Sequence, residues 1–560
     1  MIVELLRQGL VRGAIVAAAL VLALPPRSNV WAAAPGWDLV WNDEFEGSQV
    51  DPAKWTKEVT NNPANNEQQG YTAEQVTVSG GNLVITSENI PTQGPDGQPY
   101  RSGRVHSNFT KKYGRWEVRA DLPTSKGMWP AIWLLPDTQQ YPWPSGGEID
   151  IMENRGQQPQ LTSSAYHWGA SWRDHQFRFS EQTMARFGQP VDFHDGFHTY
   201  SVEWDATKVR FFVDDVHHWT LYDADTGGFL GDDSAPMWTM LNTAVGGDFL
   251  GAGGQPDGTT VWPQKFLIDY VRISDRNNDP LRFRNGGFEQ NDGSLAGWSV
   301  FGNRLDHNNV SVHNEAVAGG DASLKIFGQF RSTNNFSGVS QGITVSPGDP
   351  VEASAESFIR SQDALAAGTQ VQMKIEFYSD FGGRHGTSSL LDEVVATIAD
   401  PASMQDVWRP HELSAVAPAG AVEARIAFVF VQSPANGGGA IHLDNVSFRN
   451  LNLPSAADAD GNGVVDGQDM LQWQRNLGKP DPDGSAEGDF NLDGAVDRDD
   501  LDVWQEQSGA GTANQQGSAT PIPEPSSTMM ALTGLAGLLR LGAVRGERSA
   551  DAASQVVSAE

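Results

Sequence analysis

One octapeptide of this chain alternates acidic and apolar residues after two glycines: Gly146-Gly147-Glu148-Ile149-Asp150-Ile151-Met152-Glu153. Successive side chains of a β-strand point to opposite faces of the sheet. Glu148 and Asp150 therefore share one face of a strand, and Ile149 and Ile151 share the other. The pattern indicates a strand with one polar face and one packed face.

Glu153 does not fit strict alternation, because it lies five positions after Glu148 and would fall on the apolar face. An unpaired carboxylate buried there would be strongly destabilising. A β-bulge, one extra residue at Ile151-Met152, returns Glu153 to the side of Glu148 and Asp150. The sequence therefore predicts a bulged strand with three carboxyl groups on one face.

Three carboxyl groups crowded on one face repel one another when ionised, so we expect at least one to hold a proton at neutral pH. Hydrolysis of a glycosidic bond needs one protonated carboxyl to help the leaving oxygen depart. It also needs an ionised carboxyl to attack the anomeric carbon or to activate water. The middle residue, Asp150, can hydrogen-bond the attacking carboxylate. The alternative is a calcium site or a surface cluster of acids, against which the adjacent isoleucines favour a buried strand.

Residues 36–275, which surround this strand, hold 13 of the 18 tryptophans. Short stretches of period-two alternation, such as 116–122, predict an antiparallel β-sandwich. Aromatic rings on a concave sheet can cover the apolar faces of sugar rings while polar neighbours bond the hydroxyl groups. The alternative for any one tryptophan is a place in the core. Those available for sugar contact are Trp129, Trp133, Trp143, Trp168, Trp172 and Trp238.

The Glu-Ile-Asp-Ile-Met-Glu stretch resembles the active-site strand of glycoside hydrolase family 16, in the bulged Glu-x-Asp-x-x-Glu form typical of laminarinases. The resemblance runs along nearly all of 36–275. Further matches, in order, are Asn66-Glu67-Gln68, Tyr71-Thr72, Ser102-Gly103-Arg104, Tyr113-Gly114-Arg115-Trp116-Glu117, Gly127-Met128-Trp129-Pro130-Ala131-Ile132-Trp133-Leu134-Leu135-Pro136, Phe197-His198-Thr199-Tyr200, Glu203-Trp204 and Asn242-Thr243-Ala244-Val245-Gly246-Gly247.

This resemblance implies a retaining endo-glucanase on a concanavalin-like β-jelly-roll sandwich. By position in the motif, it implies Glu148 as the nucleophile, Asp150 as its assistant and Glu153 as the acid/base. No catalytic cofactor is implied. The family often carries a structural Ca²⁺, to which Asp269 would contribute.

The resemblance also implies a β-glucan substrate. His167, in Ala165-Tyr166-His167-Trp168-Gly169, favours internal β-1,3-glucosidic bonds. Hydrolysis of β-1,3-1,4-glucan, agarose or carrageenan remains an alternative, as does a non-catalytic glucan-binding protein on the same sandwich. Residues expected to contact sugar are Asn66, Arg104, Trp129, Trp133, His167, Trp172 and Trp238.

Composition limits the remaining functions. The 560 residues are enough for several domains, and 38 basic against 70 acidic residues give a formal net charge of −32. A surface of that sign repels phosphate backbones, so no nucleic-acid partner is expected. The absence of cysteine excludes disulfides, zinc-thiolate sites and thiol catalysis.

Residues 281–450 again show short alternating stretches, without a cluster of acids or histidines that suggests a second active site. Asn285-Gly286-Gly287-Phe288-Glu289 and Ile441-His442-Leu443-Asp444-Asn445-Val446 resemble carbohydrate-binding modules of families 4, 9 and 22. That resemblance implies a second β-sandwich in which Glu289 and Asp444 share a structural Ca²⁺. The alternative is a spacer sandwich that binds no sugar.

Residues 455–510 hold two matched acidic loops, each followed by a short helical pattern. Their residue types suit Ca²⁺, which takes six or more oxygen ligands, and the main-chain carbonyls of Val464 and Ala495 complete the sets. The duplicated loop resembles a type I dockerin, a small α-helical, EF-hand-like domain, and implies a docking partner. The alternative is an acidic linker. The side-chain ligands are Asp458, Asp460, Asn462, Asp466 and Asp469 in one loop, and Asp489, Asn491, Asp493, Asp497 and Asp500 in the other.

The two ends of the chain resemble targeting signals. An apolar run after Arg7 and Arg12 predicts a signal peptide at 1–32, with a membrane anchor as the alternative. After a linker at 511–520, the residues 521–548 resemble a PEP-CTERM sorting signal, with a plain tail as the alternative. We therefore expect a mainly β protein that is secreted or associated with the cell envelope.

Overall fold

The computed structural model describes residue 34 and residues 36–508, apart from short gaps. The predicted signal peptide, the 511–520 linker and the predicted sorting signal lie outside the described residues. The gaps are residues 61–63, 91–96, 278–279, 292, 304–308, 330–333, 383–388, 433–436, 454–456, 461–463, 480–486, 491–495 and 497.

Mainly antiparallel strands build the region from residue 37 to residue 276, as the period-two pattern predicts, with one parallel pair between residues 69–71 and 100–102. They are β1 (Trp37–Asp43), β2 (Trp55–Lys57), β3 (Gln69–Tyr71), β4 (Val76–Ser79), β5 (Asn82–Asn89), β6 (Tyr100–Ser102), β7 (Arg104–Lys111), β8 (Gly114–Asp121), β9 (Met128–Leu135), β10 (Glu148–Glu153), β11 (Thr162–Trp168), β12 (Gln176–Gln182), β13 (Ala185–Arg186), β14 (Gln189–Pro190), β15 (Phe197–Trp204), β16 (Lys208–Val213), β17 (Val216–Tyr222), β18 (Met237–Val245) and β19 (Gln264–Arg276). Short helices are η1 (Ala73–Gln75), η2 (Asp223–Asp225), α1 (Phe229–Asp232), η3 (Asp248–Leu250) and α2 (Gly251–Gly254).

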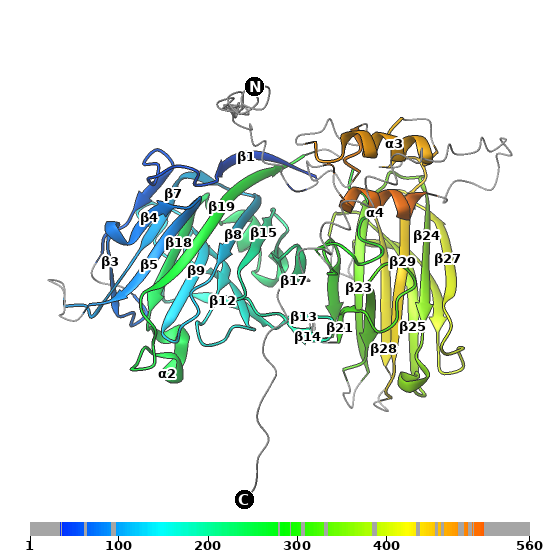
Figure 1. The fold of residues 1–560 in the computed structure, drawn as a ribbon, viewed down its shortest axis with the longest axis horizontal. Helices are drawn as coiled ribbons and strands as arrows, with labels where there is room; N and C mark the ends of the chain where they lie inside the picture. Colours follow the sequence, from blue (N-terminus) through cyan, green and yellow to red (C-terminus); the bar gives the residue numbers. More distant parts are fainter. Residues whose placement is uncertain are drawn as a thin grey trace, which may run out of the picture. The chain divides into compact units, whose positions relative to one another are not determined.

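Apart from β13 and β14, which belong to a third sheet, these strands form two sheets (Figure 1). The two sheets share one hydrophobic core. One sheet has the strand order β12-β11-β10-β9-β18-β7-β2, and the other includes β17-β16-β15-β8-β19-β5. In β8 the alternation places Trp116, Val118 and Ala120 in the core with no exposed surface. From the first sheet, Ile132 and Ile149 enter the same core. Because burial of a large apolar side chain contributes about 1.5–3 kcal/mol, this shared core holds the two sheets face to face as a jelly-roll sandwich.

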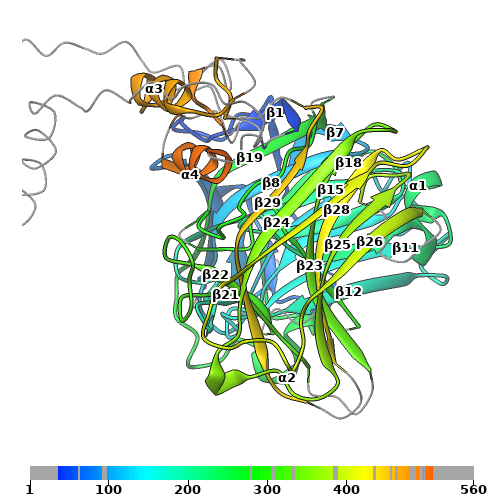
Figure 2. The same cartoon turned by 90° about the vertical axis from the view of Figure 1, so that its right-hand side faces the viewer.

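A second group of strands follows (Figure 2). It has a core of its own that includes Trp298 and Phe428. Its strands have the orders β26-β25-β28-β23-β20, which continues to β17, and β21-β22-β29-β24-β27, which continues to β13. The strands are β20 (Ser299–Gly302), β21 (Val310–His313), β22 (Ser323–Phe327), β23 (Asn335–Thr344), β24 (Pro350–Phe358), β25 (Thr369–Tyr378), β26 (Leu390–Ala399), β27 (Arg409–Val416), β28 (Glu423–Gln432) and β29 (Ala440–Asn450), with η4 at Ser361–Asp363.

The acidic block contains two helices, α3 (Gly467–Asn476) and α4 (Arg498–Gln507), where the sequence shows its two helical patterns. A small core that includes Trp473, Phe490 and Val503 joins them. Within the described part of the chain, no helix combines the length and the apolar character that crossing a membrane requires.

Candidate active site

The bulge predicted in the acidic strand is present in β10. Asp150 lies opposite Trp133 of β9, Met152 lies opposite Ile132, and Glu153 lies opposite Ala131, so β10 carries one extra residue. Positions 131 and 133 of β9 share a face because they are two residues apart. Asp150 and Glu153 therefore share that face too, as the sequence predicts.

The pairing of β10 with β11 shows the same extra residue, since Asp150 faces Ala165 and Glu153 faces Ser163. On the opposite side of the strand, Ile149 and Met152 are fully buried in the core. The apolar residues thus pack β10 against the core, while the three acids project from the opposite face of the sheet.

The three carboxyl groups lie close enough to influence one another. Carboxylate oxygens of Glu148 and Asp150 and a ring nitrogen of His167 all lie within 4.8 Å of one another. Burial, aided by the charge of Asp150, raises the pKa of Glu148 to about 8. The same two causes raise the pKa of Glu153 to about 8. Burial also raises the pKa of Asp150 to about 7. At neutral pH the group therefore retains protons that exposed carboxyls would have lost.

Each acid has a different hydrogen-bonding partner. The indole N–H of Trp143 donates to Oε2 of Glu148 over 2.7 Å. The indole N–H of Trp129 donates to Oε1 of Glu153 over 2.9 Å. Both bonds favour the ionised carboxylate and lower its pKa, against the effect of burial. Each indole thus holds one oxygen of its carboxylate in place.

A pair of histidines continues from the middle acid. Nε2 of His167 lies 3.2 Å from Oδ2 of Asp150, and Nδ1 of His167 lies 2.8 Å from Nε2 of His175. Burial lowers the pKa of His175, and the neighbouring His167 lowers it further. Sequence reasoning identified His167 but missed His175, which belongs to no recognised motif.

Other predicted contact residues lie on the same sheet face, and the nearest of them, Trp133, is directly opposite Asp150. The indole of Trp133 donates to Oδ1 of Asn242 over 2.7 Å. The ring of Trp238 stacks on His106 at 4.5 Å between centroids. Arg104 faces Asn242 across the β7–β18 pair. Asn242 belongs to a matched stretch, but its side chain was not predicted to form part of the site.

Two predicted contact residues lie in loops. The Nδ2 atom of Asn66 donates to both carboxylate oxygens of Asp248, over 2.9 and 3.0 Å. Trp172, in the loop between β11 and β12, is 68% exposed. Trp168 was expected to be available for sugar contact, and this is wrong. It is 3% exposed and belongs to the core, because it follows His167 by one position and faces the opposite way.

The predicted calcium ligands of the strand regions are hydrogen-bonded or ion-paired. Asp269 forms an ion pair with Arg119 at 2.5 Å. Oδ2 of Asp444 accepts hydrogen bonds from the backbone of Ala318 and Gly319. Burial raises the pKa of Asp444 to about 6, and the charge of Glu289 contributes to that shift. The carboxylate of Glu289 accepts hydrogen bonds from the backbone of Asp321 and Ala322.

Three acids of the first predicted calcium loop also gather. Carboxylate oxygens of Asp458, Asp460 and Asp469 lie within 4.8 Å of one another, and these residue types suit Ca²⁺. Asp466 caps α3 by accepting from the backbone N–H of Gln468. Val464 is exposed. In the second loop, the carboxylate of Asp500 accepts from the backbone of Phe490, next to Asp489. Asn462, Asn491, Asp493, Ala495 and Asp497 lie outside the described residues.

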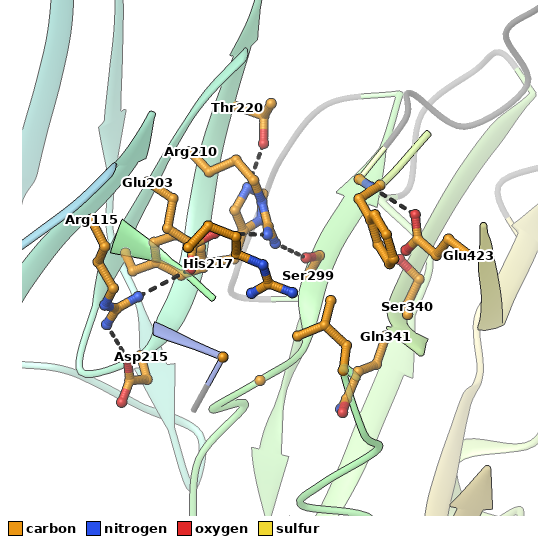
Figure 3. Close-up of a pocket in the computed structure, with 18 of the residues that line it drawn as sticks. Arg115, Glu203, Arg210, Asp215, His217, Thr220, Ser299, Ser340, Gln341 and Glu423 are labelled. Carbon is orange, nitrogen blue, oxygen red and sulfur yellow. Dashed lines mark hydrogen bonds and ion pairs between the residues drawn. The ribbon is translucent and has the colours of Figure 1, made fainter. Parts of the chain in front are cut away.

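A cavity of about 660 Å³ lies away from the trio, and Figure 3 shows residues that line it. Its most buried cation, Arg115, forms ion pairs with Glu117, Glu203 and Asp215 at 2.9, 3.1 and 2.7 Å. Glu203 also pairs with Arg210 at 3.1 Å, so this part of the cavity wall has the character of a structural ion-pair network.

Comparisons with known proteins match the region that holds the trio. Residues 63–271 match the family described as glycosyl hydrolases family 16. A beta-glucanase of Rhodothermus marinus is 36% identical over 260 residues, which are 43% of this chain and 86% of that protein. A glucan endo-1,3-beta-glucosidase of Cryptopygus antarcticus is 32% identical over 42% of this chain and 91% of that protein.

Two further matches widen the comparison. A keratan-sulfate endo-1,4-beta-galactosidase of Sphingobacterium multivorum is 30% identical over 48% of this chain and 61% of that protein. Among solved structures, the catalytic domain of an endo-1,3-beta-glucanase (laminarinase) from Thermotoga petrophila RKU-1 shares 35% sequence identity. That match covers 43% of this chain and 99% of that chain, with a TM-score of 0.39.

Proposed function

The chain belongs to glycosyl hydrolase family 16, and from this premise we propose that it is a retaining endo-glycosidase that hydrolyses internal β-1,3-glucosidic bonds of laminarin-type β-glucans. One observation carries the proposal: the bulge in β10 brings Asp150 and Glu153 to one face. Glu148 lies on that face beside Asp150.

In the first chemical step, Glu153 donates its proton to the glycosidic oxygen, and Glu148 attacks the anomeric carbon. The bond from that carbon to the leaving oxygen breaks as an ester bond to Glu148 forms. Trp143 holds Oε2 of Glu148, which leaves Oε1 as the attacking atom. Trp129 holds Oε1 of Glu153, which leaves Oε2 to carry the proton.

In the second step, Glu153 accepts a proton from water, and the water oxygen displaces Glu148 from the anomeric carbon. Two displacements at one carbon retain its configuration. Asp150 lies between the two glutamates in sequence and within 4.8 Å of Glu148, so it positions the nucleophile and takes up the proton that Glu148 must lose before it attacks. The raised pKa of Glu153 keeps its proton available at neutral pH.

The substrate assignment rests on the relatives that are named beta-glucanase and glucan endo-1,3-beta-glucosidase, each covered over most of its length. Trp133 and Trp238 lie beside the trio and offer rings for sugar stacking, which fits a neutral glucan. The relative named as a galactosidase favours a second candidate, hydrolysis of a galactose-containing polymer.

A panel of laminarin, lichenan, agarose, carrageenan and keratan sulfate tests the substrate class by release of reducing ends. We expect release from laminarin, and loss of that release in Glu148→Gln and in Glu153→Gln. Release from the galactose polymers alone would refute the glucan assignment. Binding of laminarin without any release would favour a non-catalytic glucan-binding protein.

For the remaining regions we propose structural Ca²⁺ at the Asp458, Asp460 and Asp469 cluster, at the second acidic loop and between Glu289 and Asp444. The oxygen-rich donor sets support this assignment. The same proposal includes a docking partner for the acidic block and export to the cell surface or the medium. Both rest on the sequence resemblance alone.

A further inference from the structure

A row of aromatic rings runs along β12, beginning at the histidine pair of the site. The rings of His167 and Phe177 lie 5.4 Å apart and 11° from parallel. Those of His175 and Phe177 lie 5.6 Å apart, and those of Phe177 and Phe179 lie 5.9 Å apart at 20°. The four rings therefore form one continuous row of nearly parallel, stacked rings.

Strand register places this row on the same sheet face as the three acids. Glu148 lies opposite His167 in β11, which lies opposite Phe177 in β12. Directly opposed residues of neighbouring strands point to the same face. Two strand spacings of ~4.8 Å separate β10 from β12, a distance that a few linked sugar rings can bridge.

The two phenylalanines are exposed to solvent, whereas the opposite face of their strand contacts the buried ring of Trp168. Phe177 is 47% exposed and Phe179 is 57% exposed. Arg178, between them, points the opposite way and lies over the buried ring of Trp168 at 5.6 Å. The phenylalanines add little to the core, so their contribution to folding stability is small. Two adjacent exposed rings on one face are instead typical of a binding surface.

We propose that Phe177 and Phe179, with His175, form a platform that binds the glucan chain on the β12 side of the trio. This inference rests on the proposed function and extends its binding surface. Its occupant is a sugar chain, because the row is continuous with His167, which contacts Asp150. A glucan chain that contacts the tryptophans of β9 and β18 at one end crosses β10 at the trio. Its other end then reaches this platform.

The platform implies a preference for long substrates. Trp133 and Trp238 lie on one side of β10, and the β12 row lies on the other. Only an oligosaccharide long enough to cross β10 can contact both. Each additional sugar that stacks on a ring removes apolar surface of both partners from water. Binding should therefore strengthen with oligosaccharide length until the β12 row is covered.

The test uses the full chain with Glu148→Gln as the binding background, titrated with laminari-oligosaccharides of increasing length. We expect Phe177→Ala with Phe179→Ala to weaken binding of the longest oligosaccharide about tenfold or more, as expected from losing two stacking rings. Binding of the shortest ligand that the parent retains should stay unchanged. Arg178→Ala, on the same strand but the opposite face, is the matched control and should leave all affinities unchanged.

Equal affinity of the double variant and its parent for every length would overturn the platform while leaving the proposed hydrolysis intact. If the unsubstituted chain neither cleaves nor binds any glucan, the proposed function fails, and the platform fails with it. Sedimentation of both proteins tests a competing role for this face. A change of oligomeric state in the double variant, with unchanged sugar affinity, would identify the row as a contact between copies and overturn the proposal.

Discussion

Replacement of Glu153 by glutamine should stabilise the protein, and the gain should grow with pH. Gln keeps the oxygen that accepts from Trp129 but removes the buried charge. In the folded state the pKa of Glu153 rises from 4.5 to about 8. A folded pKa above the unfolded one means that the folded state binds the proton more tightly. Stability is therefore full below about pH 4.5 and declines as the pH rises to about 8.

The size of the effect follows from that shift. Three to four pKa units at ~1.4 kcal/mol each set an upper limit of about 5 kcal/mol. Solvent at the open face of the sheet and the shared protons of Glu148 and Asp150 reduce this, so we expect about 1 to 3 kcal/mol at pH 8. For a sandwich of this size, each kcal/mol moves the melting temperature by roughly 2–4 °C.

Scanning calorimetry of the full chain at pH 4.5 and pH 8 measures the difference. Glu153→Gln should melt several degrees above the unsubstituted protein at pH 8 and close to it at pH 4.5. Glu46→Gln, at an exposed position, is the control and should melt with the unsubstituted protein at both pH values. An equal gain at both pH values, or a loss at pH 8, would refute the idea that Glu153 is buried beside like charges.

Three further perturbations test other parts of the account. Trp143→Phe removes the hydrogen-bond donor that lowers the pKa of Glu148. The acid limb of the kcat/KM profile should therefore move to higher pH, and kcat should fall about tenfold. An unmoved limb would show that the indole does not act on the nucleophile. Chelation of Ca²⁺ should speed hydrogen exchange in peptides from 457–508 while peptides from 37–276 stay protected; equal protection with and without chelator would count against calcium in the acidic block. Trp116→Ala should destabilise the first sandwich by about 3–5 kcal/mol in denaturant unfolding, because its ring is fully buried between the sheets; a loss below 1 kcal/mol would contradict that packing.

The bulge was predictable because an acid five positions after another cannot share its face in a regular strand. Only one extra residue reconciles Glu153 with Asp150, and the pairing of β10 with both neighbours contains it. The core was predictable for the same reason, since alternation in β8 separates Trp116 and Val118 from the charged residues between them.

The features that the sequence did not predict depend on the path of a loop and on the register between strands. Trp143 was expected to stack on sugar, and instead its N–H contacts Glu148, which only the path of the connecting loop determines. The alternation of Phe177 and Phe179 was visible in the sequence. Whether they lie on the same face as the trio depends on the register of β12 against β11, and no local pattern determines that register.

Covalent trapping of the glycosyl-enzyme tests the central claim most directly. A 2-deoxy-2-fluoro laminari-oligosaccharide with a good leaving group forms the ester and slows its hydrolysis, and mass spectrometry of the digested protein locates the sugar. The account predicts one labelled peptide, with the sugar on Glu148, and no label in Glu148→Gln. A label on Glu153, or steady turnover with no adduct and an inverted product, would contradict it.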